Sequence, residues 1–142
     1  MAFNMLVVDD SSPMRTVIRK AVTISGFNVG EYYAAANGRE ALEILRSHWV
    51  DLVITDYNMP EMNGLELLTH MKEDELLAVI PVVVVSTEGS EQMIDEFMAK
   101  GAAGYIQKPF TPENIREILN KILGDTEDGQ GSDERSDEDL DF

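Results

Sequence analysis

The stretch Met5-Leu6-Val7-Val8-Asp9-Asp10 is apolar at consecutive positions and ends in two carboxylates. Leu52-Val53-Ile54 and Val82-Val83-Val84-Val85 have the same continuous apolar character. Strands of this kind are covered on both faces, as in parallel sheets with a helix layer on each side. The three runs therefore predict the centre of a parallel sheet, and residues 29–34 and 105–106 are weaker strand candidates.

Segments with helical spacing alternate with these strands. Apolar side chains recur at i, i+3, i+4 and i+7 within residues 14–21 and 115–122, and a shorter stripe spans residues 93–98. Ser12-Pro13 and Thr111-Pro112 place a capping hydroxyl before a proline at the first helical position. The alternation of strand and helix predicts an α/β domain with right-handed crossovers.

Further signals mark where the predicted helices begin and end. Asn37 and Asn63 each precede a glutamate by three residues, as in a capping box. Trp49 is expected to pack near a helix end. Glycines stand where three helices are expected to stop, at Gly26, Gly101 and Gly124.

The net charge of −16 is concentrated at one end of the 142-residue chain. Residues 125–142 hold nine acidic side chains against Arg135 alone, so half of the net charge lies there. This segment has almost no apolar residues and is predicted to be a disordered tail. We therefore expect one folded domain over residues 1–124, followed by the tail over 125–142.

The charge and composition also limit the partners and the compartment. An acidic chain is poorly suited to binding nucleic acid or an anionic membrane surface directly. No stretch approaches the roughly 20 consecutive apolar residues that a membrane span requires. Cysteine is absent, and Met1-Ala2-Phe3-Asn4 does not have the basic and apolar regions of a secretory signal. We expect a cytoplasmic protein.

Polar side chains follow four of the predicted strands directly, at the edge where ligands bind in open α/β sheets. They are Asp9, Asp10, Asp56, Ser86, Thr87 and Lys108. Carboxylates that are brought together repel one another unless a cation lies among them. Oxygen ligands suit Mg²⁺, which also shares phosphate oxygens. The pattern therefore predicts a Mg²⁺ site beside a lysine and a hydroxyl.

These groups are suited to phosphoryl transfer, in which positioning and charge stabilisation supply most of the catalysis. A carboxylate can act as the nucleophile and form an aspartyl-phosphate. Asp56 is the predicted acceptor because it stands alone at its strand end, whereas Asp9 and Asp10 have the character of a metal-binding pair.

Across residues 4–123 the chain resembles the receiver domains of two-component response regulators. The matching motifs are Val7-Val8-Asp9-Asp10, Asp56-Tyr57-Asn58-Met59-Pro60 with Gly64, Ser86, and Lys108-Pro109-Phe110. Gly64-Leu65-Glu66-Leu67-Leu68 and Gly104-Tyr105 resemble more particularly the stand-alone chemotaxis regulators of the CheY type. The resemblance implies a flavodoxin-like, doubly wound sheet of strand order 2-1-3-4-5, flanked by five helices.

The resemblance also implies how the site works. Mg²⁺ is expected to bind Asp10, Asp56, the backbone carbonyl of Asn58 and, through water, Asp9. Lys108 is expected to bind the phosphoryl group on Asp56, through a Lys–Pro peptide that is often cis in the family.

Other residues are implied to convert phosphorylation into a change of shape. The spacing of the family selects Ser86 as the switch hydroxyl rather than the adjacent Thr87, which is expected to narrow access to the phosphate. Tyr105 is expected to rotate inward and remodel the face made by the fourth helix, fifth strand and fifth helix. Asn58 and Glu88 are expected to flank the site and influence removal of the phosphoryl group.

These observations favour a monomeric signalling protein that a histidine kinase phosphorylates. Its expected partners are a target, such as a flagellar motor switch protein, and a phosphatase. It is expected not to be an enzyme beyond self-phosphotransfer and autodephosphorylation. A phosphorelay intermediate is the alternative. A metal-dependent phosphohydrolase is less favoured, because Asn58 stands where a second acid–base aspartate would be. A flavin- or nucleotide-binding protein is disfavoured, because the first strand–helix turn contains no glycine.

Overall fold

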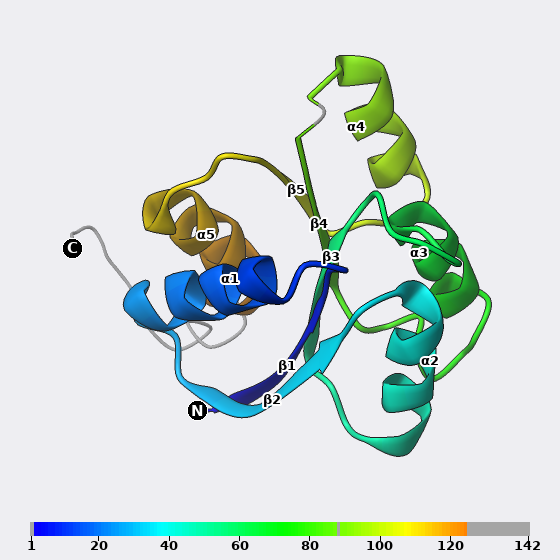
Figure 1. The fold of residues 1–142 in the computed structure, drawn as a ribbon, viewed down its shortest axis with the longest axis horizontal. Helices are drawn as coiled ribbons and strands as arrows, with labels where there is room; N and C mark the ends of the chain where they lie inside the picture. Colours follow the sequence, from blue (N-terminus) through cyan, green and yellow to red (C-terminus); the bar gives the residue numbers. More distant parts are fainter. Residues whose placement is uncertain (1, 88, 125–142) are drawn as a thin grey trace.

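A five-stranded parallel sheet of order β2-β1-β3-β4-β5 forms the middle layer of the protein, with helices on both faces (Figure 1). The computed structural model describes residues 2–87 and 89–124. The strands are β1 (Phe3–Val8), β2 (Val29–Ala35), β3 (Leu52–Asp56), β4 (Val82–Ser86) and β5 (Gly104–Gln107). The helices are α1 (Ser12–Ile24), α2 (Gly38–Ser47), α3 (Gly64–Lys72), α4 (Glu91–Ala99) and α5 (Pro112–Leu119), which a π-helical turn, η1 (Asn120–Gly124), continues.

This architecture confirms the predicted doubly wound, flavodoxin-like fold. Helices α1 and α5 cover one face of the sheet, and α2, α3 and α4 lie on the other (Figure 1). Among the described residues, no helix is both long and apolar enough to cross a membrane. The tail expected at residues 125–142 lies outside the described residues.

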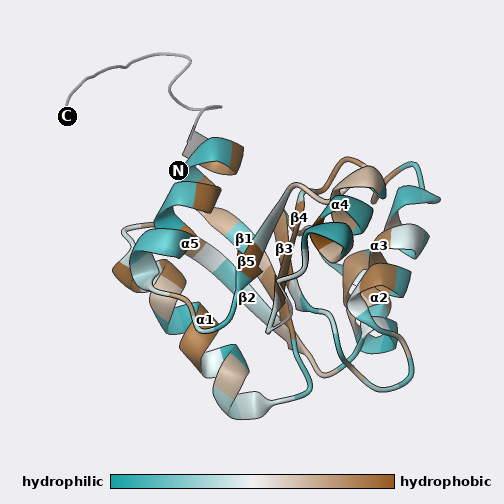
Figure 2. Cartoon of the chain, turned by 90° about the horizontal axis from the view of Figure 1, so that it is seen from above, coloured by the Kyte–Doolittle hydropathy of each residue, from teal (hydrophilic) through white to brown (hydrophobic). Residues whose placement is uncertain are grey.

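Alternate side chains of the central strands supply two separate cores. Leu6 and Val8 of β1 belong to the cluster beneath α2, α3 and α4, whereas Met5 and Val7 belong to the cluster beneath α1 and α5. Every residue of β3 and β4 is buried, which explains why their sequences are apolar without alternation. Figure 2 shows the apolar strands between helices whose polar sides face outward.

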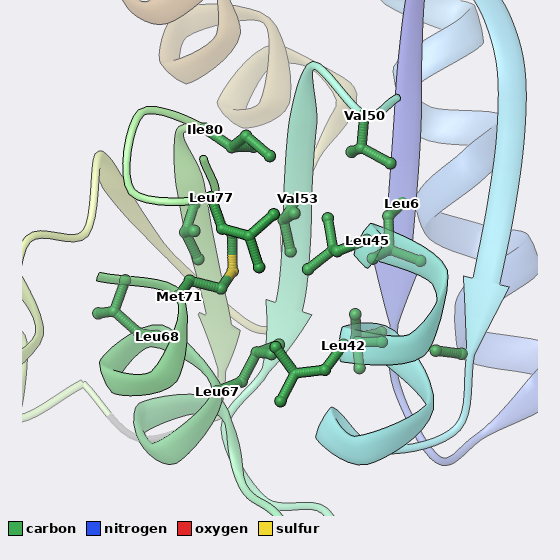
Figure 3. Close-up of a cluster of buried hydrophobic side chains, with 14 of the residues drawn as sticks. Leu6, Leu42, Leu45, Val50, Val53, Leu67, Leu68, Met71, Leu77 and Ile80 are labelled. Atoms are coloured by element: carbon green, nitrogen blue, oxygen red, sulfur yellow. The ribbon is translucent and has the colours of Figure 1, made fainter. Parts of the chain in front are cut away.

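The larger core includes several leucines where α2 and α3 meet the sheet. Figure 3 shows Leu42 of α2 next to Leu67 of α3, and Leu45 of α2 next to Val53 of β3. Leu67, Leu68 and Met71 of α3 are fully buried there. This packing holds the end of β3 in a rigid setting, because close-packed interiors deform little.

Helix ends follow the sequence signals with one shift. The cap of α1 is Ser11 rather than Ser12: the Ser11 side chain accepts from the backbone N–H of Met14. Asn63 and Glu66 form the predicted capping box of α3, with both reciprocal hydrogen bonds. At Asn37 only half of the box forms, because the Glu40 carboxylate accepts from Ala36 N–H instead.

The structure also tests the predictions made for two glycines and for Trp49. Gly26 and Gly101 follow helix ends with φ angles of 97° and 105°, the left-handed conformation that favours glycine. Trp49 does lie near the end of α2, as predicted, but its expected role as a packing residue is wrong, because 68% of it is exposed. Its indole N–H donates to Asp51 Oδ1 at 2.7 Å, so a hydrogen bond in place of burial fixes its position.

Candidate functional site

Three carboxylates meet at the carboxyl-terminal edge of the sheet. Asp9 and Asp10 follow β1, and Asp56 is the last residue of the neighbouring β3. One ligand oxygen from each lies within 4.8 Å of those from the other two. Asp9 and Asp56 are buried and Asp10 is exposed, so the cluster has two oxygens fixed in the protein and one at its mouth.

Lys108 brings a positive charge to this cluster from the far edge of the sheet. Its Nζ lies 3.4 Å from Asp9 Oδ2 and 3.4 Å from Asp56 Oδ1. The lysine follows β5, and its backbone N–H donates to Ser86 O at 2.8 Å, which ties the end of β5 to the end of β4. The Lys108–Pro109 peptide is cis.

Short backbone hydrogen bonds orient the two buried carboxylates. Ser11 N–H donates to Asp9 Oδ1 at 2.9 Å, and Tyr57 N–H donates to Asp56 Oδ1 at 2.8 Å. Arg15 adds a guanidinium hydrogen bond to the backbone oxygen of Asp9 at 2.6 Å, a contact that the sequence analysis did not anticipate. The carboxylate positions are therefore set by the start of α1 and by the loop after β3.

That loop also approaches α3 closely. Gly64 N–H donates to Tyr57 O at 2.9 Å. A Cβ on Gly64 would collide with the backbone oxygen of Asp56. Glycine is therefore required at this position by the approach of the β3 end to the start of α3.

The charges in the site do not balance without a cation. Burial raises the pKa of the Asp56 carboxyl above its ordinary value, and the neighbouring charge of Asp9 raises this pKa further. The Lys108 ammonium and the hydrogen bond from Tyr57 N–H lower it and offset part of this effect. Three carboxylates face the Lys108 ammonium and the Arg15 guanidinium, which contacts only the backbone oxygen of Asp9, so this cluster attracts a further positive charge.

The donor set fits the predicted magnesium. Asp9, Asp10 and Asp56 offer carboxylate oxygens, which are the ligands that Mg²⁺ prefers in proteins. Asn58 lies in the exposed loop just after β3. The contribution of its backbone carbonyl to the metal stays a prediction.

The predicted switch residues lie at the end of β4, just after it, and on β5. Ser86 is the buried last residue of β4, next to β3, with 1% of its surface exposed. Thr87 is exposed, and its backbone oxygen accepts from the Gln107 side chain at 3.5 Å. Tyr105 is half-buried on β5, with its hydroxyl oxygen inside the protein. Glu88 lies outside the described residues.

Sequence reasoning assigned no role to Phe97, which links two parts of the site. This residue of α4 is 1% exposed. Its ring meets Tyr57 edge to face at a centroid distance of 5.4 Å and stacks on Tyr105 at 6.0 Å. The aromatic series therefore runs from the residue after Asp56 through α4 to β5. The apolar stripe at residues 93–98 predicted that Phe97 is buried but not which rings it meets.

The raised pKa of Asp56 predicts a pH-dependent stability in metal-free protein. The folded state holds the Asp56 proton more tightly than the unfolded chain does, so ionisation opposes folding once the pH rises above the ordinary value of 3.8. The gain in melting temperature from Asp56→Asn should therefore be smallest below that pH and grow as the pH rises through the folded-state pKa.

Thermal melts of both proteins between pH 3 and 8, with a chelator present, measure this difference. Excess Mg²⁺ at neutral pH should narrow the gap, since a bound cation stabilises the wild-type site. A gap that does not change with pH would show that the carboxylate charge is not what destabilises the metal-free site.

Comparison with known proteins agrees with this geometry. Residues 5–120 match the model of the response regulator receiver domain. A chemotaxis protein CheY homolog from Campylobacter jejuni is 40% identical over 129 residues, which cover 90% of this chain and 97% of the relative.

Solved structures show the same fold. Chemotaxis response regulator CheY4 of Vibrio cholerae superposes with a TM-score of 0.77 at 32% identity, covering 87% of this chain and 100% of that structure. The CheX–CheY–BeF₃–Mg²⁺ complex of Borrelia burgdorferi matches with a TM-score of 0.76 at 30% identity, covering 85% of this chain and 89% of that one. The chain therefore belongs to the response regulator receiver domain family and is similar within it to the CheY chemotaxis proteins.

Proposed function

We propose that the protein is a phosphorylation switch of a chemotaxis pathway that accepts a phosphoryl group from a histidine kinase on Asp56. The arrangement of charge at the sheet edge carries this proposal. Asp56 lies 3.4 Å from the Lys108 ammonium and within 4.8 Å of the Asp9 and Asp10 carboxylates. The site therefore places the proposed nucleophile, Asp56, beside the Lys108 ammonium and beside carboxylate oxygens that could bind a metal cation.

The proposed reaction transfers the phosphoryl group from a kinase imidazole to the Asp56 carboxylate. A carboxylate oxygen forms the new O–P bond as the P–N bond breaks, and the electron pair returns to the imidazole. Lys108 neutralises phosphoryl oxygens from the side of β5. Mg²⁺ would be held by Asp10, Asp56, the Asn58 backbone carbonyl and, through water, Asp9, and would supply further charge neutralisation when bound.

Ser86 is the proposed switch hydroxyl, in preference to Thr87. Ser86 is buried at the end of the strand beside Asp56, whereas the Thr87 side chain is exposed. Tyr105 is proposed to respond from β5, and the surface of α4, β5 and α5 is the face that a target reads. Asn58 and Glu88 are proposed to influence how fast the phosphoryl group is removed.

The similarity to CheY proteins supports chemotaxis as the setting. We propose a cytoplasmic monomer whose partners are a histidine kinase, a flagellar motor switch protein and a phosphatase. The CheX–CheY complex supports recognition by another protein, and its beryllium fluoride and Mg²⁺ support the use of both as probes. Its own chemistry is proposed to be limited to self-phosphotransfer and autodephosphorylation. A phosphorelay intermediate is the second candidate, since the same site could return its phosphoryl group to a histidine.

Incubation with acetyl phosphate, with and without Mg²⁺, tests the proposal. Intact mass spectrometry should show the gain of one phosphoryl group, and a chelator added before the acetyl phosphate should prevent this gain. Because an aspartyl-phosphate can be short-lived, binding of beryllium fluoride is measured in parallel. If neither a phosphoryl adduct nor metal-dependent binding of beryllium fluoride is found, the receiver chemistry proposed here is wrong.

A further inference from the structure

The exposed side of α1 is basic, although the chain as a whole is strongly acidic. Helix α1 carries Arg15, Arg19 and Lys20 and has no acidic residue in its 13 positions. The net charge of the chain is −16, so this helix opposes the overall charge. Arg19 and Lys20 are exposed, so their charges face outward beside the edge strand β2.

A groove with apolar and cationic walls runs between α1 and β2. Its lining residues are Thr16, Arg19, Lys20, Thr23, Ile24 and Tyr32. Ile24 is 68% exposed, and the Arg19 guanidinium lies 4.3 Å above the centre of the Tyr32 ring. A second, more polar groove shares Arg19, Thr23 and Tyr32 and extends along β2, where Glu31 adds one carboxylate, so the positive charge is on the α1 side. The two form one continuous surface.

The end of the same chain has the complementary composition. Residues 137–142 read Asp-Glu-Asp-Leu-Asp-Phe, in which four carboxylates accompany two large apolar side chains. A ligand that matches this groove carries both negative charge and apolar side chains, because the Arg19 and Lys20 charges lie beside exposed apolar surface. Neither the groove nor residues 137–142 belong to the proposed phosphorylation site.

The chain is also long enough to bring its end to the groove. Twelve residues, 125–136, separate Gly124 from the segment at 137–142, and an extended chain spans about 3.3 Å per residue, or roughly 40 Å. Ile122 and Leu123 pack against the same core cluster as Phe27 and Tyr32, which line the two grooves. The tail thus departs from the face of the sheet that carries the groove. A tether of this length gives an effective concentration in the millimolar range.

We propose that the acidic C-terminal segment, residues 137–142, docks in the groove between α1 and β2 of its own chain, with Leu140 and Phe142 on the apolar surface. Exposed ion pairs are individually weak and are screened by salt, so the docking is reversible. While docked, the tail covers the basic face of the helix that begins directly after Asp9 and Asp10. The inference does not depend on phosphorylation.

Paramagnetic relaxation in the full-length protein tests the docking. Because the chain has no cysteine, a nitroxide on Ser136→Cys labels one site and leaves every tail acid and apolar residue in place. At low ionic strength, the amide signals of α1 and β2 should broaden more than those of α2 and α3. About 1 M salt, where the Debye length is about 3 Å, should remove the difference.

Charge reversals in the labelled chain provide the matched comparison. Arg19→Glu and Lys20→Glu should each weaken the broadening over α1 and β2, and Leu140→Ser with Phe142→Ser should weaken it as well. Arg46→Glu, an equal reversal on the exposed surface of α2, should leave it unchanged. A dispersed amide spectrum verifies that each variant is folded.

Three outcomes would overturn the proposal. The first is broadening that is equal over both sides of the sheet. The second is broadening centred on the exposed apolar residues Trp49 and Leu76 at the other groove. The third concerns a mixture of spin-labelled protein without isotope enrichment and isotope-enriched protein without the spin label. Broadening that persists undiminished in this mixture would place the tail on a neighbouring molecule.

Discussion

Asp56→Asn is expected to abolish metal-dependent phosphoryl uptake from acetyl phosphate while leaving the fold intact. The amide has nearly the shape of the carboxylate but is a far weaker nucleophile, and it removes one of the three clustered negative charges. The fold should survive because the side chain lies at the end of β3, beyond the apolar cores. Intact mass after incubation with acetyl phosphate and Mg²⁺ measures the loss.

Asp95→Asn is the matched control, since it makes the same substitution at an exposed position on α4. This variant should gain one phosphoryl group as the wild type does. An acid-labile phosphoryl adduct on Asp56→Asn, formed at the wild-type rate, would mean that another residue is the acceptor.

Phe97→Ala is expected to give the largest loss of stability among substitutions beside the site. Truncating a fully buried phenylalanine costs about 3–5 kcal/mol of unfolding free energy, because the transfer energy of the ring is lost and a cavity remains. Phe97 is 1% exposed and contacts the rings of both Tyr57 and Tyr105, so both aromatic contacts are lost together. The melting temperature should fall by about 10 °C or more.

Chemical denaturation of the wild type, Phe97→Ala and Met98→Ala measures this effect. Met98 is the next residue of α4 but is 45% exposed, so its truncation should cost much less. Equal losses in the two variants would show that the ring of Phe97 does not fill the core between α4 and the sheet.

Much of the fold was predictable because the decisive residues act locally. The apolar runs of β1, β3 and β4 are continuous because both of their faces are covered, and that pattern requires no knowledge of distant contacts. The meeting of Asp9, Asp56 and Lys108 was also predictable, since parallel strands bring their carboxyl ends to one edge. In contrast, β2 lies at the edge of the sheet and mixes exposed with half-buried residues, so its sequence signal was weaker.

Features that depend on tertiary detail were not predictable. The role of Phe97 depends on which rings lie above and below it, and a helical stripe specifies only the buried side. Trp49 is held by a hydrogen bond to Asp51 rather than by burial, so its aromatic character misled the prediction. The cap of α1 shifted to Ser11 because two adjacent serines compete for one capping position, and only the backbone geometry distinguishes them.

The ion pair between Asp9 and Lys108 joins residues that are 99 positions apart. A ribosome that has made β1 and β3 has already produced all three carboxylates, but the ammonium that faces them arrives only with the end of β5. A chain that ends before β5 therefore holds all three carboxylates without the ammonium that pairs with Asp9 and Asp56. The ammonium partner of these carboxylates therefore becomes available only after strands β1 to β4 have been made.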